Sequence, residues 1–296
     1  MLSVIRFVFA CLQALSPSLA AKLAVRLASK PRRFPRKPRE QEQLASAERI
    51  EFIGSKGRRC VAWAWGEGPI VLVAHGWESR GSQMATMAMA IADRGYRAVA
   101  IDFSAHGDSE GKSVSFKDFG EDVLALSQQF SEIEAFVGHS AGGVLSMGMR
   151  QKGFRAKRYC TLGSPTAPYP AVEGIRKILQ PSEKTLDAVR AIYARQLGAT
   201  WPEIEAGLAF REPDGELLMI FDRDDKEVSH TQGELIQGVW PSAQLIKTQG
   251  LGHRRLMWAP DIVEAVTLFV STGAIEGSAL SPSEETQSTL LGKTAS

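Results

Sequence analysis

The 296-residue sequence predicts an α/β fold: a mostly parallel sheet with helices on both faces, interrupted by a helical insertion. First, short apolar runs alternate with helical patterns over most of residues 49–272, which favours a parallel sheet covered on both sides. Second, Pro69–Ala74 is continuously apolar, as in a strand that is buried on both faces. Third, no convincing strand occurs between Leu162 and Leu217.

The first half of the chain predicts an antiparallel pair followed by alternating strands and helices. A Gly-Ser-Lys-Gly turn separates the first two strand patterns, and such a turn favours antiparallel pairing. Met and Ala recur at helical spacing after Ser82, and Gly95 ends that helix. We expect strands at Arg49–Ile53, Cys60–Trp65, Pro69–Ala74, Tyr96–Ile101, Ala135–Val137 and Arg158–Leu162, and helices at Ser82–Asp93, Phe116–Phe130 and Gly142–Gln151.

The second half of the chain interrupts the alternation and then resumes it. We expect helices at Leu186–Leu197, Pro202–Ala209, Thr231–Val239 and Pro260–Val270, and strands at Leu217–Phe221 and Gln244–Lys247. The predicted organisation is a basic amphipathic N-terminal segment (1–48), an α/β core (49–164 and 215–272), a helical cap (165–214) and a tail (273–296). The tail is rich in Ser and Thr, so we expect it to be disordered.

The N-terminal segment differs from the rest of the chain in charge. Residues 1–39 contain nine basic and no acidic side chains, whereas the whole chain carries a formal charge of only +2. The body is therefore mildly acidic, which argues against nucleic-acid binding. The basic residues are Arg6, Lys22, Arg26, Lys30, Arg32, Arg33, Arg36, Lys37 and Arg39.

Three interpretations of this segment stay open. A signal peptide would explain Arg6, the apolar run at 7–15 and the small residues near Ala20, and predicts export. An uncleaved amphipathic segment predicts a cytoplasmic protein that contacts an anionic membrane peripherally. Turnover of soluble substrates would then survive removal of residues 1–39. A helix that packs on the body would instead make the truncated protein unstable. The apolar run is too short to span a bilayer.

The three cysteines indicate neither a disulfide framework nor a metal site. Cys11, Cys60 and Cys160 are widely spaced and odd in number, and no CxxC or Cys/His cluster occurs. We expect buried, reduced thiols, with no bound metal and no cofactor.

A candidate nucleophile lies in the stretch Gly138-His139-Ser140-Ala141-Gly142. This G-x-S-x-G pattern falls between an expected buried strand and an expected helix. A sharp strand-to-helix turn of this kind exposes the serine oxygen at the top of the sheet, and the small neighbours avoid clashes. The N-terminus of the following helix also favours negative charge there.

An activated serine requires a base and an orienting acid. Of the five histidines, His253 follows the last strand in a glycine-bounded loop, Gly250-Leu251-Gly252-His253, and is the candidate base. The acid is expected after the preceding strand, where Asp222, Asp224 and Asp225 cluster. Position alone leaves the choice among these three open. The oxyanion would bind to the amides of Ala141 and Trp77, the latter after the strand Pro69–Ala74.

Together these motifs resemble the α/β-hydrolase superfamily over about residues 50–271. The resemblance rests on HGW at 75–77, DFSAHGDSEG at 102–111, GHSAGG at 138–143, DRDD at 222–225 with Val228, and GLGH at 250–253. It implies an α/β-hydrolase core with a cap, Ser140 as nucleophile, His253 as general base, and the Trp77 and Ala141 amides as oxyanion hole. The family's spacing implies Asp225 as the acid, with Asp222 in the place of a usual glycine. Ala105 also stands where glycine is common.

The resemblance implies a serine hydrolase that cleaves a small-molecule carboxylic ester or thioester through an acyl-enzyme intermediate. A serine at the elbow argues against the aspartate-nucleophile branch, the haloalkane dehalogenases and epoxide hydrolases. The alternatives that stay open are a serine peptidase, a hydrolase of other amide or carbon–carbon bonds, and a non-catalytic binding protein with a hydrolase fold.

Overall fold

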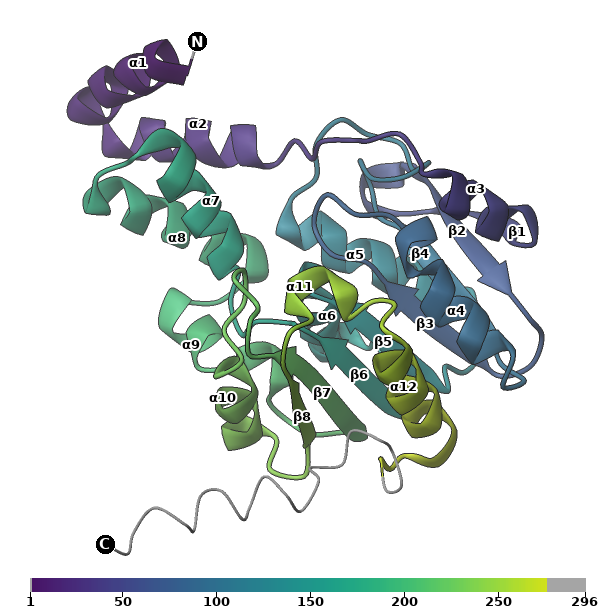
Figure 1. The fold of residues 1–296 in the computed structure, drawn as a ribbon. Helices are drawn as coiled ribbons and strands as arrows, with labels where there is room; N and C mark the ends of the chain where they lie inside the picture. The colour runs from purple at the N-terminus through teal and green to yellow at the C-terminus, as the bar shows by residue number, and fades with distance from the viewer. Residues whose placement is uncertain (1, 276–296) are drawn as a thin grey trace, which may run out of the picture.

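The computed structural model describes residues 2–275 and has an eight-stranded sheet at its centre (Figure 1). The strand order is β1-β2-β4-β3-β5-β6-β7-β8, and β2 runs antiparallel to its two neighbours while the other pairs are parallel. The predicted α/β fold with a mostly parallel sheet is therefore confirmed. The strands are β1 (Glu48–Ile53), β2 (Arg59–Trp65), β3 (Ile70–Ala74), β4 (Arg97–Asp102), β5 (Ala135–His139), β6 (Arg158–Leu162), β7 (Glu216–Asp222) and β8 (Gln244–Thr248).

Helices cover both faces of the sheet and bury the two sides of each central strand. On β3, Val71 and Val73 pack with α4 (Ala85–Ala92) and α12 (Pro260–Thr272), whereas Leu72 lies in the core of the opposite face. That face is covered by α5 (Phe116–Ser127), α6 (Ala141–Met147) and α10 (Gln232–Val239). Successive strand residues point to opposite faces, which is why these strands read as continuously apolar.

Several element ends differ from the sequence prediction. The helix expected at Gly142–Gln151 is α6 followed by a 3₁₀ turn (Gly148–Lys152), and the one expected from Ser82 begins as a 3₁₀ turn (Gly81–Met84). The helix expected at Pro202–Ala209 is broken by Gly207, which has a φ of 82° between α9 (Trp201–Glu205) and a 3₁₀ turn (Leu208–Phe210). A further 3₁₀ turn, Ser55–Gly57, joins β1 to β2, and α11 (Gly252–Arg255) precedes α12.

The chain between β6 and β7 contains helices and no strand. Besides α9 it forms α7 (Tyr169–Leu179), which the sequence pattern did not predict, and α8 (Glu183–Leu197). The Ser182 hydroxyl accepts the Thr185 amide and begins α8, and Gly198 ends it with a φ of 73°. Leu186 and Val189 of α8 are buried.

The N-terminal segment forms three helices: α1 (Leu2–Leu15), α2 (Pro17–Ala28) and α3 (Pro38–Ala45). α2 packs against α8 and α7 (Figure 1). Its buried face is Ala20, Ala21, Ala24 and Val25, small side chains that let the two helices approach closely. The Arg6 guanidinium donates to the last carbonyls of α7, at Lys177 and Ile178, where a cation is favoured by the helix dipole.

None of the helices within residues 2–275 is long and apolar enough to cross a membrane. The expectation that all three cysteines are buried is wrong for Cys11, which is exposed on α1, while Cys60 and Cys160 are buried. Cys11 is exposed because α1 contacts α2 and α7 through its other side. The predicted disorder of the tail concerns residues that lie almost entirely outside the described part of the chain.

Candidate active site

Ser140 lies in the sharp turn between β5 and α6. Its backbone has φ 52° and ψ −124°, a conformation that L-residues rarely adopt and that is held by the surrounding structure. The neighbouring glycines are needed for close packing: a Cβ on Gly142 would lie 2.2 Å from the His75 carbonyl oxygen, and one on Gly143 would lie 2.0 Å from Ser164 Oγ. The turn predicted from the G-x-S-x-G pattern therefore places its strain at the serine itself.

The structure brings Asp225 and His253 together. His253 Nδ1 lies 2.6 Å from Asp225 Oδ2, so the ring can donate its proton to the carboxylate. The other oxygen, Asp225 Oδ1, accepts the amides of Glu227 and Val228 at 2.7 and 2.9 Å. Both carboxylate oxygens are thus engaged, and the side chain is fully buried. The backbone of its own turn therefore orients the Asp225 carboxylate toward the histidine.

Asp222 holds the histidine loop through a different set of contacts. Its Oδ1 accepts the amides of Gly252 (2.8 Å) and Asp224 (3.0 Å), while its Oδ2 accepts the Leu251 amide (3.0 Å) and the Thr248 hydroxyl (2.8 Å). Burial pushes the pKa of the Asp222 carboxyl upward, but the hydrogen bonds outweigh it and the pKa lies below its ordinary value. The carboxylate therefore stays ionised and ties the two loops together.

His139, beside Ser140 in sequence, also positions His253. Its Nε2 lies 3.0 Å from the His253 carbonyl oxygen, and the two rings are 4.6 Å apart. Burial lowers the pKa of His139 well below its ordinary value, so the ring is neutral and Nε2 carries the proton that it donates. The sequence patterns do not single out His139. Its contact with the distant His253 loop carries no local sequence signal.

Ser140, after β5, and His253, after β8, lie at the same edge of the sheet, although β6 and β7 separate their strands. Ser140 donates its amide to Leu162 at the end of β6, and a Cβ on the next residue, Gly163, would lie 3.2 Å from His253 Nδ1. No hydrogen bond joins the Ser140 hydroxyl to His253 within the described chain. Such bonds often tighten only when substrate binds. Glu227 Oε2 lies 3.9 Å from His253 Nε2, a carboxylate that sequence reasoning did not single out.

The predicted oxyanion donors flank Ser140. Ala141 begins α6 directly after it, and the loop after β3 (residues 75–80) passes against it, since a Cβ on Gly76 would lie 3.0 Å from Ser140 Cβ. Among residues 2–275, neither the Trp77 amide nor the Ala141 amide donates to a protein acceptor. Both donors are therefore free of internal partners, as an oxyanion site requires. The Trp77 ring packs in an aromatic cluster with His106, Phe116 and Phe119.

Two buried histidines shape the loop after β3. His75 Nδ1 bonds the Gly76 carbonyl at 2.7 Å, and His106 Nε2 accepts the Glu78 amide at 3.2 Å. Burial lowers the pKa of each ring to about 3, so both are neutral at physiological pH. They hold the backbone on either side of Trp77.

The N-terminal segment reaches this same loop. Arg32 pairs with Glu78, and Arg80 pairs through two nitrogens with Glu40 at 2.7 and 2.9 Å. Arg80 also donates to the carbonyls of Phe34 and Pro35. Arg80 and Glu40 are both buried. Glu40 of α3 and the connection that precedes α3 therefore form part of the support of residues 75–80.

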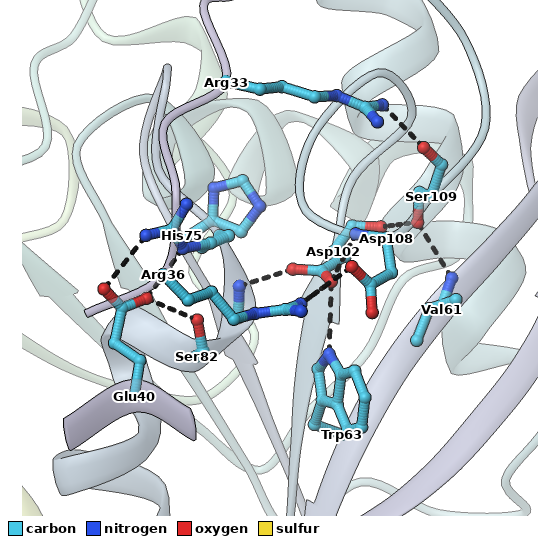
Figure 2. A network of polar contacts seen from close by, with 12 residues as sticks. Arg33, Arg36, Glu40, Val61, Trp63, His75, Ser82, Asp102, Asp108 and Ser109 are labelled. Carbon is cyan, nitrogen blue, oxygen red and sulfur yellow. Dashed lines mark hydrogen bonds and ion pairs between the residues drawn. The ribbon is translucent and has the colours of Figure 1, made fainter. Parts of the chain in front are cut away.

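Figure 2 shows the polar network beneath that loop, with Glu40 beside Ser82 and the buried Asp102 beside Trp63. Asp102 accepts the amides of Gly81 and Asp108 at 2.6 and 2.9 Å and the Trp63 indole at 3.1 Å. The loop that follows Asp102 is therefore tied to the start of the 3₁₀ turn after residues 75–80. Ala105 has a φ of 64°, which explains why glycine suits this position.

Comparison with known proteins identifies the fold. A family model described as the Alpha/beta hydrolase family matches residues 70–266. An esterase from Pyrococcus furiosus superposes with a TM-score of 0.62 at 17% identity, covering 81% of this chain and 98% of its own. The thioesterase domain of the curacin biosynthetic pathway has a TM-score of 0.57 at 16% identity, covering 76% of this chain and 99% of its own. An epoxide hydrolase from Vigna radiata has a TM-score of 0.55 at 17% identity, covering 77% of this chain and 97% of its own.

No curated protein matches the sequence, so the comparisons establish the fold and leave the substrate open. Within the described residues no group of three or more His, Cys, Asp or Glu side chains could hold a metal ion. The parallel sheet, the strained serine after β5 and the match over residues 70–266 agree with one another. The chain is a member of the alpha/beta hydrolase family and, as such, a hydrolase.

Proposed function

We propose that this hydrolase cleaves a carboxylic ester or thioester of a small molecule through an acyl-enzyme intermediate. Ser140 is the nucleophile, His253 the general base and Asp225 the acid that orients it. The amides of Trp77 and Ala141 form the oxyanion hole. The observation that carries this assignment is the 2.6 Å contact between His253 Nδ1 and Asp225 Oδ2, at the same edge of the sheet as the strained serine.

The chemistry follows from this tautomer. With the Nδ1 proton held by Asp225, His253 Nε2 has a free lone pair and takes the proton of the Ser140 hydroxyl as Oγ attacks the acyl carbon. The tetrahedral oxyanion accepts hydrogen bonds from the Trp77 and Ala141 amides. Its collapse breaks the bond to the leaving group, which receives the proton from His253. Water then attacks the acyl-enzyme by the same route, releases the acid and restores Ser140.

Esters and thioesters are favoured over the other substrates for two reasons. Ser140 stands at the elbow, and a carboxylate nucleophile, which the epoxide-opening branch uses, is absent from that position. Esterases and a thioesterase are among the similar folds, and their leaving groups need less protonation than an amine does. Peptidase and carbon–carbon hydrolase activities remain outcomes of the substrate test.

A fluorophosphonate probe tests the assignment directly, because only an activated serine labels quickly. We expect rapid labelling of the wild-type protein and none of Ser140→Ala, with Ser164→Ala, a buried serine that follows β6, labelled as the wild type. Turnover of p-nitrophenyl esters of graded chain length, run beside acyl-thioesters, then selects the substrate class. Equal labelling of wild type and Ser140→Ala, or normal turnover by His253→Ala, would overturn the proposal.

A further inference from the structure

The outward side of α1 is apolar and uncovered. Val4, Phe7, Val8 and Leu15 are 65, 70, 57 and 86% exposed, whereas Phe9 on the opposite side is 2% exposed. Positions 4, 7, 8, 11 and 15 fall on one stripe of a helix, so the exposed thiol of Cys11 lies within this stripe. Figure 1 shows α1 at the end of the molecule that is farthest from the sheet, with the cap helices beneath α2.

The basic residues of the N-terminal segment divide into two groups. Arg32 bonds to Glu78, Arg33 to carbonyls of the loop after β4, and Arg36 to Asp108. These three side chains already have partners within the protein. Lys22, Arg26 and Lys30 are exposed. Their side chains form no ion pair or hydrogen bond with other described residues. Lys37, directly before α3, is also exposed and forms no ion pair with other described residues, so three of these four available charges lie on α2 and just after it.

We propose that α1 and α2 form a docking surface for an anionic lipid bilayer. The apolar stripe of α1 enters the interface, and Lys22, Arg26 and Lys30 bind lipid phosphates. The proposal is independent of the hydrolase assignment. α1 has 14 residues, a length that suits a helix lying in the interface and falls short of the roughly 20 needed to span.

Charge favours a bilayer over a second copy of this chain as the partner. Residues 1–39 contain no acidic side chain, so a two-fold pairing of this surface would bring like charges on α2 together. An anionic membrane instead offers negative charge beside apolar volume, matching both parts of the surface. The exposed Leu19 and Leu27 of α2, 54 and 46% exposed, extend the apolar contact next to the cations.

Vesicle co-sedimentation of the full chain tests the surface, with phosphatidylcholine vesicles that contain or lack phosphatidylserine. We expect binding to the anionic vesicles that weakens at high salt. The double variant Phe7→Ser/Leu15→Ser should reduce the binding at least about tenfold. Lys22→Gln/Arg26→Gln/Lys30→Gln should remove the preference for phosphatidylserine. The matched control is Ile53→Ser/Leu235→Ser, which removes two exposed apolar side chains (62 and 51%) from elsewhere and should bind as the wild type.

Cys11 provides a second readout. Cys60 and Cys160 are buried and burial raises the pKa of both thiols, that of Cys60 to about 11, so an environment-sensitive fluorophore will label Cys11 selectively. Its emission should shift to the blue on addition of anionic vesicles. Circular dichroism confirms that each variant is folded. An unchanged emission together with equal binding of all variants overturns the proposal. A concentration-dependent dimer that Phe7→Ser/Leu15→Ser abolishes overturns it in favour of self-association.

Discussion

At the scale of single residues, the three aspartates after β7 have three different surroundings. Asp225 bonds the His253 ring, and Asp222 bonds the backbone that carries His253. Asp224 is exposed, and within residues 2–275 its side chain accepts only the Gly250 amide, at 2.9 Å. The spacing of the family motif implies that Asp225 is the acid. It predicts no role for the Asp222 side chain, because the family usually has glycine at that position. The aspartate at 222 adds a buried carboxylate that positions the backbone carrying His253.

Replacement of each aspartate by asparagine should therefore give three distinct results. Asp225→Asn should lower turnover of an activated ester by about 10⁴, since the amide no longer holds the productive tautomer of His253. Asp222→Asn should lower both turnover and thermal stability, because an NH₂ group would face backbone N–H donors, at a cost of about 1–3 kcal/mol. Asp224→Asn should change neither.

Turnover and the thermal unfolding midpoint, measured on all three variants, separate these roles. A silent Asp225→Asn would show that the orienting acid is misassigned. An Asp222→Asn variant with wild-type stability and turnover would show that the loop is held by other contacts.

At the scale of elements, the connection between α2 and α3 supports the loop that carries Trp77. The Arg80–Glu40 pair is buried and satisfied by further bonds from Ser82 and to the carbonyls of Phe34 and Pro35. The Arg32–Glu78 pair is exposed on its arginine side, with 73% of that side chain accessible. Removing one partner of a buried pair is costly, whereas an exposed pair contributes little.

Glu40→Ala should lower the free energy of unfolding by about 3 kcal/mol, because Arg80 is left buried without its carboxylate. It should also lower turnover, since residues 75–80 lose their support. Glu42→Ala is the matched control, because Glu42 is exposed on the same helix. This variant should change the free energy of unfolding by less than about 0.5 kcal/mol and leave turnover unchanged. Chemical denaturation and turnover of one soluble ester measure the two effects. Equal stabilities of the two variants would contradict the role of the pair.

The Arg80–Glu40 pair also predicts that the stability of the fold depends on pH. Burial pushes the pKa of Glu40 upward, but hydrogen bonds from Arg80, Ser82 and the Lys37 amide bring it below its ordinary value of 4.5. A carboxylate whose pKa is lower in the folded state stabilises the fold above its unfolded pKa, and this contribution is lost as the pH falls through the folded pKa.

The stability difference between wild type and Glu40→Gln should therefore be largest near neutral pH and shrink below about pH 4. Thermal unfolding across this range measures it, and the effects of other carboxylates such as Asp222 cancel in the difference. A difference that stays constant with pH would show that ionised Glu40 contributes no stability.

For the whole molecule, the N-terminal segment is a packed layer that contacts both the helices between β6 and β7 and the loops beside the sheet. α2 contacts α8, Arg33 donates to the carbonyls of Ala105 and Ser109, and Glu40 reaches Arg80. One continuous apolar cluster includes Phe9, Ala21 and Val25 together with Leu186 and Val189 of α8. The segment therefore stabilises both parts.

Stepwise deletion should reveal this layer. Removal of residues 1–15 should lower the unfolding midpoint slightly, and removal of residues 1–39 should lower it by at least about 5 °C and cause aggregation, because the buried face of α8 becomes exposed. Differential scanning fluorimetry and size-exclusion chromatography measure both. A stable, monomeric 40–296 fragment with normal turnover would show that the layer is dispensable for folding. That result is expected if the segment served only to contact a membrane.

Local apolar patterning and the glycines around a turn are enough to predict the sheet, the strand-to-helix turn at Ser140 and the loop that carries His253. Packing in three dimensions selects which aspartate contacts His253, makes Asp222 and His139 hold its loop, and pairs Arg80 with Glu40. It also decided that Cys11 is exposed and how the basic residues divide. Each of these depends on side chains that are distant in sequence and meet only when loops pack at one edge of the sheet. Charge and residue type are visible in a sequence, whereas the partner that neutralises a charge is chosen by packing.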